Sequence, residues 1–328
     1  MKISAYTRAL HTSDVLVIGF ATILSLLNIA FSGRIPMWWQ LVLINACISA
    51  AIVVVATVND RTGNRFVRIL HDWYIPPAVF LWFKELYFMI GPIHFGRDYD
   101  GLLITIDHWL LGVNPTEWLQ TISTPPLTEV LQIAYTLFYI LFLLVGYELY
   151  NRGDKDLFRY FMFTCVYGFF LSYLGYFFLP AVGPRFTLHD FSALDRELPG
   201  LVLTPWLRWF VNAGGSVPMG VSNAVAIAGT QRDVFPSGHT MMTLVLLYLS
   251  ARYHVRMRWF IYITGFLLIV ATVYLRYHYV VDILAGAAFM VFCVSTCPYL
   301  YAWIKRHLRT IESRLPAMDQ RGDVYHTQ

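Results

Sequence analysis

The sequence predicts an all-α membrane protein, a polytopic bundle of about eight transmembrane helices. Of its 328 residues, 57% are hydrophobic and only 13% are charged, whereas ~25% are charged in a typical soluble domain. The mean hydropathy is +0.55. Apolar runs that can cross roughly 30 Å of hydrocarbon occupy residues 15–32, 37–58, 75–93, 128–149, 159–180, 239–251, 259–275 and 281–303.

Basic residues predict the orientation of these segments, because cytoplasmic loops hold most of the lysine and arginine near segment ends. If both termini are cytoplasmic, sixteen of the 24 basic residues lie on the inner side and seven on the outer side, while Lys84 lies within a segment. We therefore expect cytoplasmic termini and outer loops that face a periplasm or lumen. The net charge of +4 reflects this bias, so nucleic acid is not an expected partner.

The first apolar run is expected to be a retained span rather than a signal peptide. Lys2 and Arg8 precede it, but it extends over residues 15–32 and lacks a convincing small-residue cleavage site. No long Pro, Gly or Ser linker separates folded units. We expect a single integral membrane domain, residues 1–310, and a polar, partly disordered cytoplasmic tail, residues 311–328.

Two outer regions are longer than turns. Residues 94–127 include a stretch that can lie along the membrane surface as an amphipathic helix, until prolines break it. Residues 181–236 carry Pro184, Pro205 and Pro218 and are expected to be irregular, with brief helices at most. The second region can serve as a lid or as passive packing over the bundle, and the sequence leaves both interpretations open.

Polar and reactive residues within the apolar segments have structural as well as functional interpretations. Lys84 and Glu85 lie near the middle of the third segment, where charges face the protein interior and mark either function or a specific pairing. All four cysteines lie inside apolar segments, which indicates small buried side chains rather than disulfides or a CxxC metal site.

His278 and Asp282 begin the last apolar segment four residues apart, so they share one face of a helix. A carboxylate there can orient an imidazole and stabilise positive charge on it. We expect His278 to act as a nucleophile on phosphorus, forming a phosphohistidine, with Asp282 as its partner. Taken alone, such a pair is more often a structural hydrogen bond than a catalytic pair.

A second motif lies about forty residues upstream, where residues 235–240 read Phe-Pro-Ser-Gly-His-Thr and open another apolar run. Free backbone N–H groups at a helix start bind anions, so Ser237 and Gly238 are expected to bind phosphate. His239 would be the general acid that protonates the leaving alkoxide, and later the base that activates the acceptor. The alternative is that Ser237 only caps the helix and that His239 is interfacial.

Arginines of the outer region are candidates to complete the phosphate site. Arg185 follows the fifth segment, and its guanidinium can bind two phosphate oxygens. Arg276 precedes His278 by two residues, which on a helix points it away from the His278–Asp282 face, so it contributes only if the helix begins later or bends. Arg232 is a further candidate.

These motifs resemble those of the type 2 phosphatidic acid phosphatase superfamily. Residues 235–240 and 278–282 resemble its second and third signature motifs, and residues 183–185 resemble a reduced first motif. The resemblance spans roughly residues 176–286 and implies a six-helix phosphatase core near the C-terminal part, with the catalytic motifs within residues 180–286. It implies a metal-independent, cofactor-free reaction in which His278, His239 and Asp282 are catalytic, Ser237 and Gly238 bind phosphate, and a lipid phosphate is the substrate.

Two departures from the family pattern bear on the reaction. Phe178 stands where the first motif usually has a lysine, and Thr272 stands where the third motif usually has an arginine. The stretch 272–279 instead resembles the branch that includes inositol phosphorylceramide synthase, which moves phosphorylated headgroups between lipids. Transfer to a lipid alcohol therefore stays open beside hydrolysis. A transporter or channel in which the same histidines relay protons is the alternative from another class.

Overall fold

The computed structural model describes residues 9–218 and 220–313, and within these ranges every regular element is a helix, which confirms the all-α prediction. The predicted tail lies outside the described residues from position 314 onward. The elements are α2 (Thr12–Ala30), α3 (Trp38–Thr62), α4 (Arg65–Trp73), α5 (Ile75–Ile93), α6 (Asp100–Leu111), α7 (Pro115–Gln120), α8 (Pro125–Thr136), α9 (Phe138–Asn151), α10 (Lys155–Gly175), α11 (Pro184–Thr187), η1 (Phe191–Ala193), α12 (Leu194–Glu197), α13 (Thr204–Gly214), α14 (Asn223–Gly229), α15 (Gly238–Arg252), α16 (Arg258–Tyr274) and α17 (Val280–Ser313).

Among the described residues, four helices are long and apolar enough to cross a membrane: α2, α3, α10 and α17. The single span predicted at 128–149 is instead the pair α8 and α9, bent by 49° at Leu137, and it makes a fifth candidate if counted as one span. Each of the other predicted segments also contains a helix, but α5, α15 and α16 do not meet the same criterion. The count of eight spans and the orientation of the termini therefore stay predictions.

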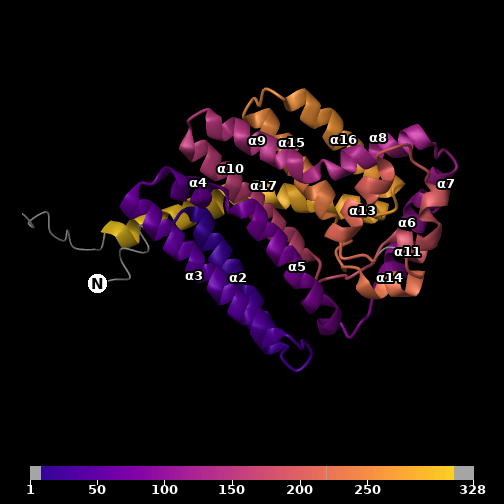
Figure 1. Ribbon diagram of the computed structural model, residues 1–328, viewed down its shortest axis with the longest axis horizontal. Coiled ribbons are helices and arrows are strands. Elements are labelled where there is room, and N and C mark those ends of the chain that lie inside the picture. The colour runs from indigo at the N-terminus through magenta and orange to yellow at the C-terminus, as the bar shows by residue number, and fades with distance from the viewer. Residues whose placement is uncertain (1–8, 219, 314–328) are drawn as a thin grey trace, which may run out of the picture.

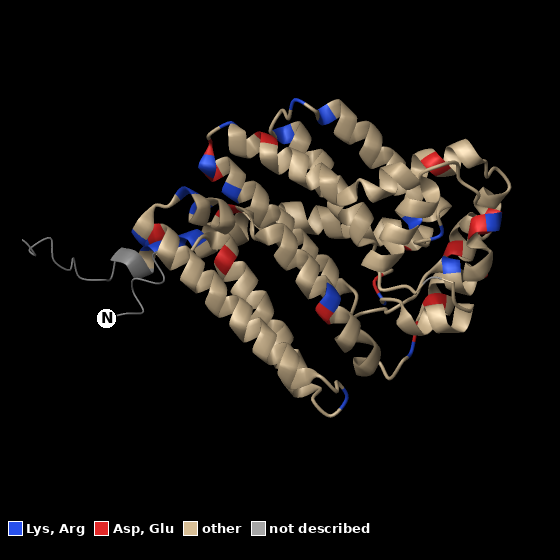
Figure 2. Ribbon diagram, viewed as in Figure 1, with Lys and Arg blue, Asp and Glu red and all other residues tan. Residues whose placement is uncertain are grey.

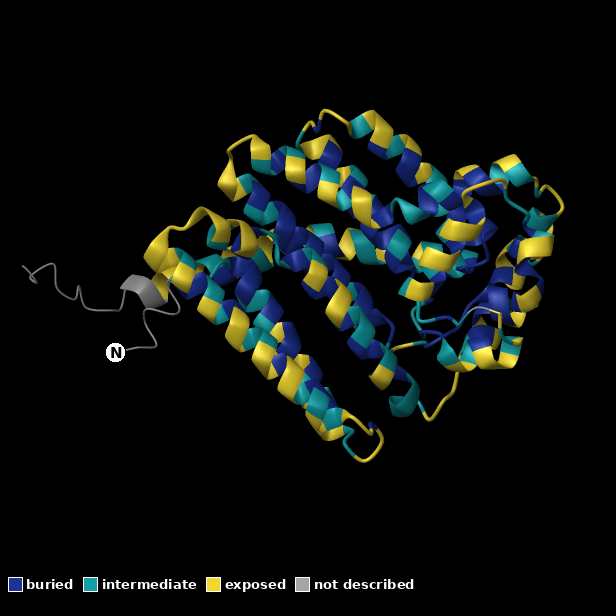
Figure 3. Ribbon diagram, viewed as in Figure 1, coloured by how far each residue is buried: buried dark blue, intermediate teal, exposed yellow. Residues whose placement is uncertain are grey.

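The long helices pack around α10, the most enclosed of the candidate spans. Some 61% of its apolar window is buried, against 28% for α3. Buried residues concentrate where α10 meets its neighbours, and exposed residues line the outer faces of α2 and α3 (Figure 3). Charged residues gather at helix ends and loops and are sparse along the helices (Figure 2). An apolar solvent around the bundle explains both distributions.

The short helices gather at one end of the molecule. Helices α6, α7, α11, α13 and α14 lie together at the right of Figure 1, whereas α17 runs toward the opposite end, where the described N-terminal part also lies. Residues 181–236 form brief helices as expected, the longest being α13 with eleven residues.

Buried carboxylates hold this outer layer on the bundle. Asp100 of α6 accepts hydrogen bonds from the amides of Val182 (3.0 Å) and Gly183 (2.8 Å). Two helical turns further along α6, the carboxylate of Asp107 accepts hydrogen bonds from the backbone amides of Val280 and Val281, both at 2.7 Å, and so caps the start of α17. Because helix N-terminal amides lack intrahelical acceptors, a carboxylate there satisfies them and the helix dipole together. Helix α6 thus fixes the segments that precede both Arg185 and Asp282.

Lys84 and Glu85 lie on α5 and have different partners. Glu85 accepts hydrogen bonds from the amides of Asn28 and Asn45, both at 2.9 Å, and is buried between α2, α3 and α5. The ammonium of Lys84 instead donates to the carbonyl of Gly214 and to the hydroxyl of Ser216 at 2.8 Å. Each charge is therefore satisfied separately. Lys84 ties the segment after α13 to α5.

Candidate active site

His278 lies just before α17, is 3% exposed and lines a cavity between the helices. Its Nδ1 lies 2.9 Å from the carbonyl oxygen of Val234 and 3.5 Å from a carboxylate oxygen of Asp282. Both neighbours accept hydrogen bonds, so Nδ1 carries the proton and Nε2 keeps the lone pair. Burial lowers the pKa of His278 to about 4, against the charge of Asp233. The ring is consequently neutral near pH 7, with Nε2 as its nucleophilic atom.

Asp282 is fully buried on the first turn of α17. One carboxylate oxygen accepts from the amide of Tyr279 at 2.7 Å, and the other has no hydrogen-bond partner in the structure. The closest contact of the His278 ring is thus with a backbone carbonyl, and the carboxylate supports it from slightly farther away. Asp282 also joins the motifs, because its backbone oxygen accepts from the amide of Ser237 at 3.0 Å.

His239 lies on the first turn of α15, and its ring centroid is 5.8 Å from that of His278. It packs between Tyr135 and Phe138, with ring centroids 4.7 and 4.5 Å away. These two aromatic residues flank the break between α8 and α9 at Leu137. The bend therefore supplies the walls that hold His239. Two imidazoles from segments forty residues apart meet at one cavity.

Ser237 is the N-cap of α15 and Gly238 its first residue, and neither is among the residues that line the cavity. The Ser237 hydroxyl accepts from the amide of Thr240 at 3.2 Å, so it caps the helix. Its own amide is already bonded to Asp282. A Cβ on Gly238 would lie 2.2 Å from the hydroxyl of Tyr176, so only glycine allows this approach. The backbone amides of the first turn remain the groups that can bind an anion.

Arg185 is the arginine that reaches the cavity. It is the second residue of α11 and is 9% exposed, and its guanidinium donates to the amide oxygen of Asn212 at 2.9 Å. The guanidinium carbon also lies 4.9 Å from the ring centroid of Tyr277. A planar donor group held on two sides in this way is preorganised to bind oxygens of a phosphate.

Arg276 is placed away from the cavity. Its backbone adopts φ +66°, and its guanidinium donates to Glu197 at 2.6 Å without lining the cavity. Its carbonyl oxygen accepts from the amide of Arg185 at 3.0 Å, so it contacts the site through the backbone. Arg232 pairs with Asp98 at 3.1 Å and does not line the cavity either. Only Arg185 of the three arginines has its guanidinium at the site.

The cavity has a volume of about 720 Å³ and two chemically distinct parts. Its polar end is formed by Arg185, Asp233, His239 and His278. The remainder is lined mostly by aromatic and aliphatic side chains of α5, α9 and α10, among them Phe80, Phe83, Phe142, Phe161, Met162 and Phe169. Such a cavity fits a molecule with one anionic end and a long apolar portion.

Asp233 is a residue of the site that sequence reasoning missed. It lines the cavity, and burial raises the pKa of its carboxyl group, whereas the charges of His278 and Arg185 lower it. Its position two residues before Phe235 was the available signal: an acidic residue directly ahead of a motif that presents a histidine. Asp100 and Asp107 were also missed, although their spacing of seven places both on one face of α6.

Residues 102–296, more than half of the chain, match the family model of the PAP2 superfamily. The matched region contains all of the predicted motif residues from Arg185 to Asp282. A search of curated proteins and a search of solved structures found no match to the chain. The chain belongs to the PAP2 superfamily.

Proposed function

We propose that this protein is an integral membrane phosphatase or phosphotransferase that acts on a lipid phosphate ester at the non-cytosolic leaflet, through a phosphohistidine on His278. Membership of the PAP2 superfamily suggests phosphatase-type activity. The several apolar helices of the chain suggest a membrane protein. The observation that carries the proposal is the pair of histidines, 5.8 Å apart between ring centroids, at the polar end of an otherwise apolar cavity.

The first half-reaction forms one bond and breaks another at phosphorus. The Nε2 lone pair of His278 attacks the phosphorus, and the bond from phosphorus to the ester oxygen breaks. His239, protonated on entry of the anionic substrate, gives its proton to the leaving alkoxide. Asp282 and the Val234 carbonyl stabilise the positive charge that develops on His278. Arg185 and the amides at the start of α15 bind the phosphate oxygens.

The second half-reaction returns the enzyme to its starting state. Neutral His239 takes a proton from water or an alcohol, whose oxygen attacks the phosphohistidine, and the bond between Nε2 and phosphorus breaks. Neither step requires a metal or a cofactor in this scheme. Water as acceptor gives hydrolysis, and a lipid alcohol gives transfer.

Transfer of a headgroup, as in the inositol phosphorylceramide synthase branch, is the second candidate. The apolar lining of the cavity favours it, because a lipid alcohol enters such a space more readily than water does. The proposed phosphate site lacks a lysine at Phe178, which is 68% exposed and does not line the cavity. A diester headgroup, which carries less charge than a monoester, suits a site with one arginine.

Both reactions are tested on purified protein in lipid nanodiscs, with radiolabelled lipid phosphate monoesters and diesters supplied with and without a lipid alcohol. The proposal predicts released phosphate or a new labelled lipid, and loss of both in His278→Ala. His108→Ala, on an exposed position of α6, is the matched control and should retain activity. Flux of solutes across proteoliposomes with no cleavage of any labelled lipid would instead identify a transporter.

A further inference from the structure

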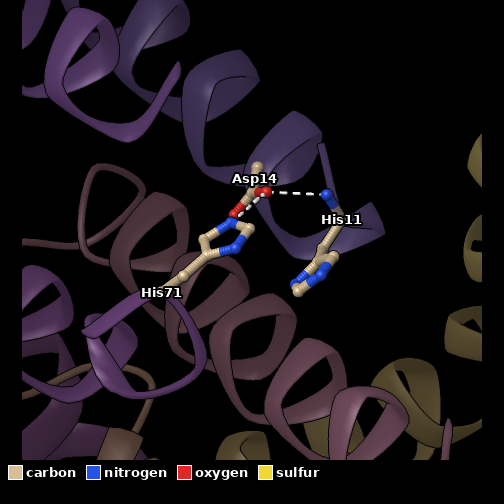
Figure 4. A group of neighbouring side chains, drawn as sticks. All are labelled: His11, Asp14 and His71. Carbon is tan, nitrogen blue, oxygen red and sulfur yellow. Dashed lines mark hydrogen bonds and ion pairs between the residues drawn. The ribbon is translucent and has the colours of Figure 1, made fainter. Parts of the chain in front are cut away.

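A second cluster of histidine and carboxylate side chains lies where the start of α2 meets the end of α4, and none of its members lines the cavity. His11 is the N-cap of α2, Asp14 lies in its first turn, and His71 lies in the last turn of α4. The two imidazoles face each other beside the Asp14 carboxylate (Figure 4). One potential ligand atom from each residue lies within 4.8 Å of the other two. Among the described residues, this is the group of three histidine, cysteine or acidic side chains whose ligand atoms lie close enough together to hold a metal ion.

Two nitrogens and one carboxylate oxygen form a donor set that zinc and related divalent transition metals bind. Metal–ligand bonds of about 2.0–2.2 Å place tetrahedral ligands roughly 3.4 Å apart. His71 Nε2 and an Asp14 oxygen are already 2.8 Å apart. His71 and Asp14 are 2% and 0% exposed, whereas His11 is partly exposed. Two of the proposed ligands are therefore buried, and the third is partly exposed.

Neighbouring side chains hold Asp14 and His71 in place by hydrogen bonds, as the residues around metal ligands commonly do. The Tyr74 hydroxyl donates to the second Asp14 oxygen at 2.8 Å. The Asn59 amide lies 3.2 Å from Nδ1 of His71. Since Nε2 of His71 lies 2.8 Å from the Asp14 carboxylate, it carries the ring proton, and Nδ1 accepts from the Asn59 amide. Metal binding at Nε2 therefore requires the other tautomer, in which the Asn59 amide turns its oxygen toward the protonated Nδ1.

The ring of His11 must also move before the cluster can receive an ion. The ring of His11 is stacked on that of His71, with centroids 4.2 Å apart and planes 21° from parallel. Parallel rings aim their lone pairs side by side, so His11 must turn to direct a nitrogen at the ion.

We propose that His11, Asp14 and His71 form a binding site for one divalent transition metal ion of the zinc class. The ion joins the start of α2 to the end of α4, two segments 57 residues apart in the chain. Its fourth coordination position is left for water, because three protein ligands are present. The ion has no assigned part in the proposed reaction, because none of its three ligands lines the cavity.

The site is tested by metal titration of the full-length protein, purified in detergent with a tag that contains no histidine and stripped with a chelator. Cobalt(II) serves as the probe, because tetrahedral coordination gives visible absorption bands, and zinc then competes with it. The proposal predicts one cobalt ion per chain, displaced by one zinc ion. His11→Gln, at the partly exposed ligand, should weaken binding at least tenfold.

The controls separate a specific site from scattered binding. His108→Gln changes an exposed histidine on α6 and should leave both stoichiometry and affinity unchanged. Zinc should raise the melting temperature of the wild type more than that of His11→Gln, because an ion that binds only the folded chain stabilises it. Equal cobalt binding by the wild type and His11→Gln, or no saturable site in the wild type, would overturn the proposal. His71→Gln repeats the test at a buried ligand.

Discussion

At the residue scale, the chemistry depends on which nitrogen of His278 is free. The contacts of Nδ1 with the Val234 carbonyl and with Asp282 decide that question in favour of Nε2. The spacing of His278 and Asp282 was sufficient to predict their pairing. It did not predict the contact with Val234, because every residue has a backbone carbonyl and the residue type does not show which one will accept a hydrogen bond.

The pH dependence of activity tests the state of His278. As the pH falls through about 4, the folded-state pKa, the ring gains a proton and loses its nucleophilic lone pair, so activity should decline there. Asp233→Asn should move this decline to lower pH, because the Asp233 charge raises the pKa of His278. The measurement is kcat/KM against pH for a phosphodiester lipid, whose own charge stays constant. A decline near ~6.5, the value of a free imidazole, would contradict this account.

The two arginines next to the motifs should respond differently to substitution. Arg185→Lys keeps the charge but loses the planar donor pair, so kcat/KM should fall by about 100-fold. Arg276→Met removes the pair with Glu197 and should lower the melting temperature, with less than about tenfold loss of kcat/KM at temperatures where the variant is folded. Kinetics and thermal unfolding of both variants check this contrast. Equal losses of kcat/KM in the two variants would indicate that Arg276 also binds the phosphate.

At the element scale, the apolar runs located the long helices because burial in lipid and burial in the protein select the same residues. Helix α3 extends from Trp38 to Thr62, and its predicted run covered residues 37–58. The break at Leu137 could not be predicted, because neither proline nor glycine marks it. Its effect is visible only in three dimensions, where Tyr135 and Phe138 enclose His239.

The capping of α17 by Asp107 gives a prediction for this scale. Asp107→Ala removes the acceptor of the Val280 and Val281 amides, and should cost about 1–3 kcal/mol of unfolding free energy. It should also lower kcat, since these amides lie only two and three residues after His278. Asp60→Ala, at an exposed position of α3, should change the free energy by less than about 0.5 kcal/mol. Similar losses in both variants, measured by denaturant titration, would argue against a specific cap.

At the scale of the whole molecule, the bundle encloses an apolar cavity whose polar end receives residues from three segments. Composition predicted a membrane protein, and of the predicted site residues Arg185, His239 and His278 line one cavity, whereas Arg276 does not. The sequence did not predict how far the cavity extends between α5, α9 and α10, because lipid-facing and cavity-facing residues are equally apolar. The direction in which Phe142 or Phe169 points follows from packing alone.

Narrowing the cavity should separate substrates by chain length. Cys165 lines the apolar part and is 6% exposed, so Cys165→Phe adds bulk there and should reduce the rate on long-chain lipid phosphates more than on short-chain ones. Val54→Phe adds the same kind of bulk on the outer face of α3, where the residue is 59% exposed, and should affect neither. Rates over a series of acyl lengths give the result. A uniform loss across the series would mean that the lipid chain binds elsewhere.

The phosphohistidine is the central claim and can be detected directly. Wild-type protein and His239→Ala are mixed with an activated aryl phosphate, whose leaving group needs no acid, then quenched in alkali, where phosphohistidine persists, and sequenced by mass spectrometry. The account predicts a phosphoryl group on His278, accumulating in His239→Ala because the base for the second step is missing, and absent from His278→Ala. A phosphoryl group on another residue, or product formation by His278→Ala at the wild-type rate, would contradict it.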